Sequence, residues 1–244
     1  MISAQEVHHN VKRKLNRINS NFSQYVSVSE VDEYLKEALG VWMNNKAFKA
    51  EANSEVRNDI RHLEIKDFKL DFENRPDKVV AKLPGNFLKR LRQYAIGSRE
   101  CISKDCEDCK NRKISINIVR SGNLNTLLED PYWDPSFIWA ETLGDEATDG
   151  LHIWHNKKFK IDSVFIDYIR KPLEVRCPSL TSSGYYTVGD KTYSTDQGLE
   201  LDQKYQINEI TDLACLFIMR DLSDGQEYQL QADKILRTIT TYLN

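Results

Sequence analysis

The chain has 244 residues, of which 40% are hydrophobic and 29% are charged, and its formal net charge is −3. This content is enough for one core, or for a core with a satellite subdomain, and aromatic residues at 10% argue against intrinsic disorder. A dedicated nucleic-acid-binding protein is usually basic, so the acidic balance counts against that class. No run of about 18 apolar residues occurs, so we expect no membrane span, and the N-terminus lacks the apolar core of a signal peptide.

Helical patterns fill the first part of the chain. Val7, Val11, Leu15 and Ile18 recur at helical spacing and predict a helix over residues 3–18 with one apolar stripe. Lys12, Arg13, Lys14 and Arg17 lie largely off that stripe. They are typical of a solvated face, although such a cluster also suits a DNA phosphate or an acidic partner.

Two further helices are predicted before residue 65. Ser27 followed three residues later by Glu30 has the spacing of a capping box, which marks the start of a helix. The apolar residues from Val31 to Trp42 then give that helix a broad buried face. A third helical segment covers residues 54–65.

The middle of the chain alternates like strands. Residues 67–84 predict a hairpin around the turn NRPDK, whereas residues 86–101 predict a helix that ends near Gly97. Because the connections between strands are short, we expect consecutive strands to be antiparallel. The remaining predicted strands cover residues 113–119, 137–143, 151–156 and 159–172.

The rest of the chain combines a short helix, a polar stretch and two final helices. Residues 124–136 predict a short helix broken by Pro131, and the Ser-, Thr- and Gly-rich stretch 179–198 predicts an extended excursion or an ordered loop. Residues 207–222 and 226–243 predict the final helices. Helices that flank a strand-rich middle indicate an α+β fold. We therefore divide the chain into N-terminal helices (1–65), a central β-rich region (66–200) and C-terminal helices (201–244).

The five cysteines form an odd number without a secretory signal, which favours a reducing compartment and free thiols. Cys101, Cys106 and Cys109 have the spacing of the first part of an iron–sulfur motif and contain half of a zinc knuckle. A fourth ligand is needed, and Cys177 is the available candidate. The polar loop lacks the small residues that let a cluster approach backbone amides, so free cysteines are the favoured interpretation and we expect no metal or other cofactor.

The sequence gives no support for an enzyme. His152 and His155 are three residues apart, which places them on opposite faces of a regular strand and away from a shared metal. The motifs of zinc proteases, α/β-hydrolases and phosphate-binding loops do not occur, and the carboxylates form no recognisable acid/base pair. We therefore expect no catalytic residues and a non-enzymatic role.

An aromatic segment offers a candidate interface. Tyr132, Trp133, Phe137 and Trp139 lie around two prolines, which stiffen the chain and reduce the entropy lost on docking. The same residues could instead fill the core beneath their own loop. Both interpretations stay open from the sequence.

The order of several short blocks resembles the ring-forming head-to-tail connector proteins of crAss-like and related Bacteroidales-infecting tailed phages. The resemblance covers about residues 10–240 and leaves the stretch 179–198 unplaced. Its blocks are SNFSQYVSVSEVDEYLKEALGVWM, SEVRNDIRHL, KVVAKLP, LNTLLEDPYWDPS, FKIDSVFIDYIRKP and INEITDLACLFIMRDLSDGQEYQ, in that order.

This resemblance implies a virion structural protein with the fold of a podophage adaptor or tail tubular protein. In that fold the N- and C-terminal helices form a bundle and the centre is an antiparallel β-rich domain. The implied partners are further copies in a ring, usually a dodecamer, the portal protein and other neck or tail rings, and the packaged double-stranded DNA in the lumen. A ring closes through heterologous contacts, and a strand that ends at Arg170, Lys171 and Pro172 gives such a contact a rigid edge.

The alternative is a small zinc- or nucleic-acid-binding phage protein. The cysteine loop and the basic first helix motivate it. Stoichiometric zinc in the purified protein would favour this alternative over the ring subunit.

Overall fold

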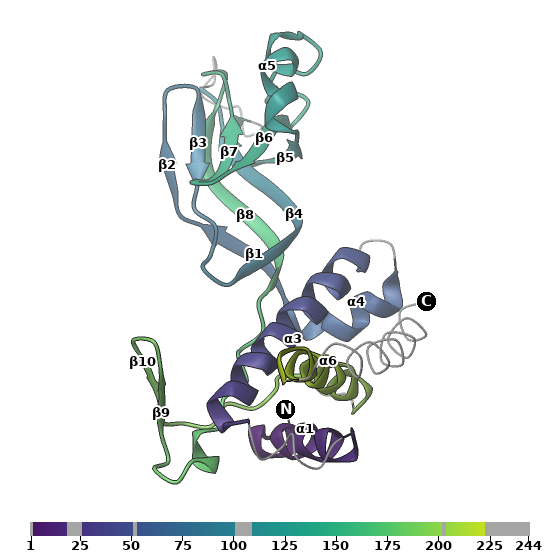
Figure 1. Cartoon of the computed structure of the whole chain (residues 1–244). Helices are drawn as coiled ribbons and strands as arrows, with labels where there is room; N and C mark the ends of the chain where they lie inside the picture. The colour runs from purple at the N-terminus through teal and green to yellow at the C-terminus, as the bar shows by residue number, and fades with distance from the viewer. Residues whose placement is uncertain (1, 19–25, 51–52, 101–108, 202–203, 223–244) are drawn as a thin grey trace. The chain divides into compact units, whose positions relative to one another are not determined.

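The computed structural model describes residues 2–18, 26–50, 53–100, 109–201 and 204–222. The chain is α+β and divides into two compact units (Figure 1). The first unit contains both ends of the chain, residues 1–58 and 172–244, and the second contains residues 59–171. Residues 172–200, which the sequence division grouped with the central region, therefore belong with the terminal helices.

The first unit contains helices α1 (Ala4–Ile18), α3 (Val28–Lys49) and α6 (Lys204–Leu222). Helix α6 packs against both α1 and α3. The predicted stripe of α1 is confirmed, because Val7, Val11 and Leu15 are fully buried. The capping box of α3 is also present: Ser27 Oγ accepts from the Glu30 amide at 3.3 Å, and the Ser27 amide donates to Glu30 Oε2 at 2.7 Å.

A hairpin completes the first unit. Strands β9 (Tyr186–Val188) and β10 (Lys191–Tyr193) pair antiparallel within the stretch that the sequence predicted as an excursion or an ordered loop. A short 3-10 helix, η3 (Pro178–Leu180), precedes them. Gly189 begins the two-residue loop of the hairpin with φ of 57°, a backbone conformation that favours glycine.

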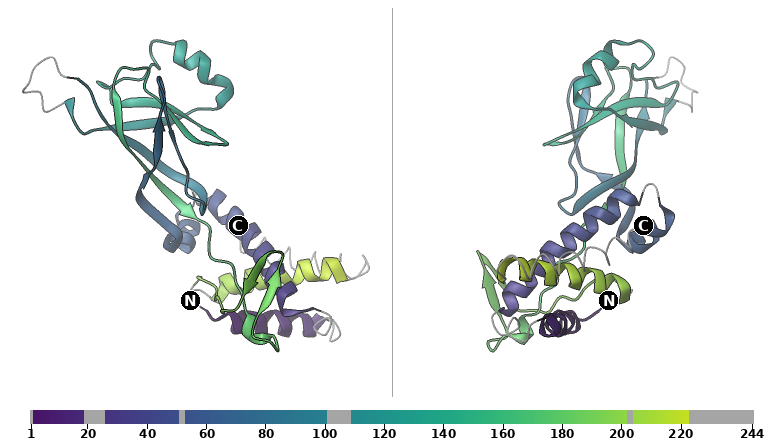
Figure 2. Two further views of the ribbon diagram at one scale, coloured as in Figure 1. Left: turned by 90° about the vertical axis from the view of Figure 1, so that its left-hand side faces the viewer. Right: turned by 45° about the vertical axis from the view of Figure 1, so that its right-hand side comes forward.

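The second unit is a sheet of eight strands in the order β1-β8-β4-β5-β6-β7-β3-β2. The sheet is curled (Figure 2). The 3-10 helix η1 (Arg61–Leu63) follows α4 (Ser54–Ile60), which spans the boundary between the units, and leads into the first strand. Helix α5 (Ser121–Glu129) contacts β6. The strands are β1 (Glu64–Leu70), β2 (Phe72–Asn74), β3 (Lys78–Ala81), β4 (Phe87–Ser98), β5 (Arg112–Ile118), β6 (Glu141–Ala147), β7 (Gly150–Trp154) and β8 (Lys160–Arg170).

The helix predicted over residues 86–101 is wrong, because this segment forms the long strand β4. It pairs with β8 on one side and with β5 on the other. At Gly97, an added Cβ would lie 2.7 Å from Ile114 Cδ1 and 2.9 Å from the Lys160 carbonyl oxygen. The chain therefore approaches its neighbours too closely for a side chain there, and tertiary packing outweighs the helical spacing of the leucines.

Two further expectations about the sheet are corrected. Strands β5 and β6 are parallel rather than antiparallel, because the chain between them makes a crossover that contains α5. The strand predicted over residues 137–143 begins only at Glu141, and residues 137–140 form a turn. The hairpin predicted around NRPDK is confirmed as β2 and β3.

The core of the second unit lies inside the curled sheet. Inward-facing residues of several strands form it, and Tyr168 contributes its ring while its hydroxyl donates to Asn86 Oδ1 at 3.1 Å. Its other buried members are Leu70, Val79, Ala81, Ala95, Ile114, Ile116, Phe137, Leu151, Ile153, Phe159, Ile161, Val164 and Ile166. Among the described residues, no helix is both long enough and apolar enough to cross a bilayer.

Candidate functional site

The most exposed large apolar side chains among the described residues of the second unit lie in the turn between α5 and β6, residues 130–141, which we call the aromatic turn. Pro131 prevents α5 from continuing. Asp130 then organises the chain, because its Oδ1 accepts from the Tyr132 amide at 2.9 Å and its carbonyl accepts from the Trp133 amide at 3.0 Å. The aromatic side chains are thus presented from an ordered backbone.

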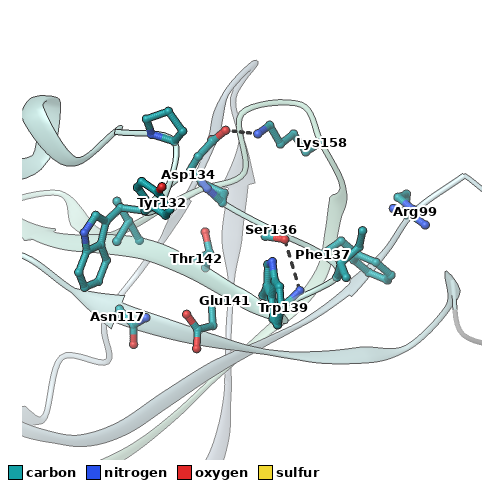
Figure 3. A pocket seen from close by; sticks show the side chains of 15 residues that line it. Arg99, Asn117, Tyr132, Asp134, Ser136, Phe137, Trp139, Glu141, Thr142 and Lys158 are labelled. Atoms are coloured by element: carbon teal, nitrogen blue, oxygen red, sulfur yellow. Dashed lines mark hydrogen bonds and ion pairs between the residues drawn. The ribbon is translucent and has the colours of Figure 1, made fainter. Parts of the chain in front are cut away.

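Four large side chains of the aromatic turn face solvent. Tyr132 is 95% exposed, Trp139 is 80% exposed, Ile138 is 63% exposed and Trp133 is 49% exposed. Together with Asn117, Thr142 and Glu141 they line a pocket of about 640 Å³ (Figure 3). A single exposed aromatic side chain needs no explanation, but several on one turn mark a binding surface.

The turn is held in a fixed conformation. Ser136 and Glu141 exchange two backbone hydrogen bonds of 2.9 and 3.1 Å, and the Trp139 amide donates to Ser136 Oγ at 3.3 Å. Ala140 has φ of 56°, in the left-handed region, and its carbonyl accepts from the Ser115 amide at 2.7 Å. A non-glycine residue in that region costs about 1–3 kcal/mol and persists only where its surroundings fix it.

Phe137 does not belong to the exposed set, so its prediction as an interface residue is wrong. Its side chain is buried, with the ring 6.0 Å from that of Phe159. The guanidinium groups of Arg99 and Arg112 lie 5.4 and 5.6 Å from the same ring. Phe137 therefore anchors the turn to the core, as the alternative interpretation of this segment proposed for all four aromatics.

One carboxylate of the turn is already neutralised. Asp134 pairs with Lys158 and accepts from Asn156 Nδ2 at 3.0 Å. Burial raises the pKa of Asp134, but the hydrogen bonds from Lys158 and Asn156 and the lysine charge outweigh it and hold the pKa below its ordinary value. Asp134 thus stays ionised, and Lys158 has its partner within the pocket.

The other predicted interface residues lie elsewhere. Arg170 ends β8, and Lys171 and Pro172 follow it, whereas Lys158, just before the start of β8, borders the aromatic turn. The strand has 11 residues, so roughly 35 Å separate the two ends at about 3.3 Å per residue. The structure therefore does not bring the two predicted groups together within one copy.

The predicted cysteine and histidine sites are only partly described. Cys101 and Cys106 lie outside the described residues, while Cys109 is buried and disulfide-bonded, so the expectation of a free thiol is wrong there. Among the described residues, no group of three or more metal-ligating side chains comes together. His152 instead pairs with Asp149 at 2.8 Å and approaches Asp145 at 3.5 Å.

The basic face of α1 is partly occupied. Lys14 Nζ pairs with Asp212 at 2.6 Å and donates to the Thr211 hydroxyl at 2.7 Å and to the Asn208 carbonyl at 2.9 Å. These three partners lie on α6. Lys14 therefore fixes α1 to α6 rather than facing a nucleic acid.

Sequence reasoning missed a buried polar network in the first unit. His8 and Asp32 are fully buried and joined by a bond of 2.6 Å between Nε2 and Oδ1. The other oxygen of Asp32 accepts from the Cys177 amide at 3.1 Å and from the Tyr186 hydroxyl. This single carboxylate connects α1, α3, the segment before η3 and the hairpin.

Arg176 extends the network. Its side chain is buried, and it donates to Glu33 at 2.7 Å and to Glu174 at 2.5 Å while its guanidinium lies 4.3 Å from the centre of the Tyr193 ring. A two-stranded hairpin is marginally stable alone, so these contacts fix β9 and β10 to the helices. The histidine, aspartate and arginine of this network lie far apart in the sequence, so no sequence spacing could have predicted their contacts.

Its chemistry is that of a structural element. His8 and Asp32 are closed off from solvent, and Cys177 is buried with its pKa raised, mainly by burial. A thiol with a raised pKa is a poor nucleophile at neutral pH. The aromatic turn, by contrast, is open to solvent.

No protein-family model and no curated protein matches the sequence.

Proposed function

We propose that this chain is a non-enzymatic virion protein that forms a ring in the head-to-tail connector of a tailed phage, below the portal, and extends the DNA channel. The proposal rests on the order of the sequence blocks that resemble such connectors. The observation that carries it is the exposed aromatic turn, whose large side chains suit contact with another protein.

The aromatic turn supports assembly on energetic grounds. Tyr132 and Trp139 expose large rings on a backbone that is already fixed, so docking orders few further bonds. Buried aromatic side chains supply much of the binding energy of protein interfaces. A surface of this kind is understood most simply as one that a neighbouring protein covers.

The arrangement of the helices supports the adaptor-like plan. Helices from both ends of the chain share the first unit, and α6 contacts α1 and α3. We propose that they form a bundle completed by the predicted helix at 226–243, which lies outside the described residues. The β-rich second unit then corresponds to the central domain of the implied fold.

The proposed partners follow from the ring. They are identical copies in a closed homo-oligomer, which the resemblance implies to be a dodecamer, together with the portal and other neck rings in the virion. Packaged DNA would pass through the lumen. The net charge of −3 suits such a channel, because a strongly basic wall would bind phosphates tightly.

The test is the content of purified phage particles. Quantitative mass spectrometry is expected to find the chain in a fixed stoichiometry with the portal protein, and cryo-electron microscopy is expected to place it in a ring next to the portal. A chain present only in the infected-cell lysate and never in particles would contradict the proposal. Elemental analysis separates the alternative function, since stoichiometric zinc would favour a metal-binding protein.

A further inference from the structure

The two ends of β8 carry groups of opposite character. Near its start lies the aromatic turn, and at its end lie Arg170, Lys171 and Pro172. The length of the strand keeps them roughly 35 Å apart within one copy. Any contact between them must therefore join two copies.

The aromatic turn is acidic. Residues 130–141 contain three carboxylates and neither lysine nor arginine. Glu141 is exposed in the pocket beside Trp139 and makes no ion pair among the described residues (Figure 3). Exposed aromatic faces also attract cations, so Tyr132 and Trp139 favour the same kind of ligand as Glu141.

The basic groups near the pocket are committed to other contacts. Lys158 pairs with Asp134, and Arg112 donates to the Ile138 carbonyl at 2.8 Å behind the turn. Arg99 lies over Phe137, on the side of that ring away from Glu141 (Figure 3). Within the part of the chain that the structure describes, none of these basic groups forms an ion pair with Glu141, so its carboxylate stays available to a cation.

The end of β8 has the matching chemistry. Lys171 is exposed and makes no ion pair among the described residues, while its amide donates to the Asn86 carbonyl at 2.7 Å and fixes the backbone. Pro172 restricts the next bond, and Leu173 is 46% exposed. The segment thus offers a cation next to apolar groups on a chain that loses little entropy on docking.

We propose that the pocket formed by Tyr132, Trp139 and Glu141 of one copy binds residues 170–173 of the next copy. This inference rests on the proposed ring and names the surfaces that join its subunits. The lysine pairs with Glu141 and lies against the aromatic faces, while the proline and leucine cover the rings. The two surfaces differ, so the contact is heterologous and repeats from copy to copy until the ring closes.

A mixing experiment tests the contact. Trp139→Ala disrupts the pocket and leaves residues 170–173 intact, whereas Lys171→Glu disrupts the binding of residues 170–173 and leaves the pocket intact. At a concentration of about 1 mM, even a contact with a Kd of about 1 mM is about 40% occupied. Native mass spectrometry of the full chain is expected to show wild-type oligomers larger than dimers and mostly monomers for each variant alone.

The mixture of the two variants is expected to give dimers and nothing larger. One intact pocket meets one intact segment in each pair, and the remaining two surfaces are both disabled. The second arm is charge reversal: Glu141→Lys combined with Lys171→Glu in one chain is expected to restore at least half of the wild-type assembly. Phe48→Ala, which removes a side chain that is 80% exposed on α3, and Lys191→Glu are the matched controls and should assemble like wild type.

Three results would overturn the inference. They are a wild-type chain that stays monomeric at this concentration, a variant mixture without dimers, and controls that fail as completely as the variants. None of them removes the proposed function, which is decided by the presence of the chain in particles. Conversely, the chain could show this contact and still be absent from purified particles. That result would contradict the proposed ring in the virion, and the protein would then be one that associates with itself outside the particle.

Discussion

The buried polar network and the aromatic turn invert the usual distribution of residues. The network places His8, Asp32 and Arg176 inside the first unit, where charged and polar groups are normally rare. The aromatic turn places Tyr132 and Trp139 outside the second unit, where large rings are rare in such density. Each arrangement costs free energy unless something offsets it.

The offsets differ. In the network, Asp32 finds three partners within the same unit, so its cost is met when the chain folds. In the aromatic turn, the exposed rings have no cover within the described residues. The comparison teaches that the first region is complete in one copy, whereas the second stays exposed in one copy and is covered only in the ring that we propose. Substitutions in the network should therefore change stability, and those in the turn should change assembly.

The largest expected loss of stability comes from Asp32→Ala. It leaves the buried His8, the buried Cys177 amide and the partly buried Tyr186 hydroxyl without their acceptor, and we expect the free energy of unfolding to fall by about 3–5 kcal/mol. Urea unfolding followed by circular dichroism measures this. Glu37→Ala on the same helix, which removes an exposed pair with Arg220 at 3.5 Å, should change the value by less than about 0.5 kcal/mol. Equal losses in the two variants would break the comparison.

Arg176→Met should lower the free energy of unfolding by about 2–3 kcal/mol at neutral pH, because two charge-assisted hydrogen bonds are lost. Its pH dependence sharpens the test. Burial raises the pKa of Glu174, but the hydrogen bond and the charge of Arg176 lower this pKa by more than burial raises it. The folded-state pKa of Glu174 therefore lies below the ordinary 4.5.

A depressed pKa stabilises the fold at pH values above the ordinary one, and this contribution is lost as the pH falls through the folded-state value. Wild-type stability should therefore drop below about pH 4.5, and the drop should be shallower in Arg176→Met. Parallel pH profiles for the two proteins would show that Arg176 does not set the titration of Glu174.

Ala140→Val should have a smaller effect, about 1–2 kcal/mol, because a β-branched side chain is strained at φ of 56°. Ala140→Gly is the matched control and should stay within about 1 kcal/mol of wild type, since glycine adopts this conformation readily. Thermal unfolding of both variants measures the difference. If valine were tolerated as well as glycine, the turn would not be fixed by its backbone.

The smallest expected change in stability comes from Trp139→Ala. An exposed side chain contributes little to folding, so the free energy of unfolding should stay within about 0.5 kcal/mol of wild type. Incorporation of the variant into particles, measured by mass spectrometry, should nevertheless fall at least tenfold. A loss of stability above about 2 kcal/mol would show instead that Trp139 serves its own core, as Phe137 does.

Local sequence patterns predicted the elements whose stability is local. The stripe of α1 and the capping box at Ser27 depend on spacing within one helix, and both are confirmed. The helix predicted over residues 86–101 was wrong because the conformation of β4 depends on strands distant in sequence. One sign of this dependence is the close approach of the neighbouring chain at Gly97. The parallel pairing of β5 and β6 likewise depends on where α5 crosses.

The candidate site was predictable in part for the same reason. Prolines and aromatics close in sequence identified the turn, and Tyr132, Trp133 and Trp139 are exposed there. Phe137 was misassigned because its burial depends on residues distant in sequence, among them Phe159, and no local pattern indicated that contact. The network was missed because its members come from four separate segments.

Hydroxyl-radical footprinting of the chain, free and in purified phage particles, tests the central claim most directly. Oxidation of Tyr132 and Trp139 is expected to be fast in the free chain and to fall at least tenfold in particles, while buried Tyr168 stays protected in both. Equal oxidation of Tyr132 and Trp139 in the two samples would contradict the account, because the aromatic turn would then have no partner where the ring is proposed to assemble.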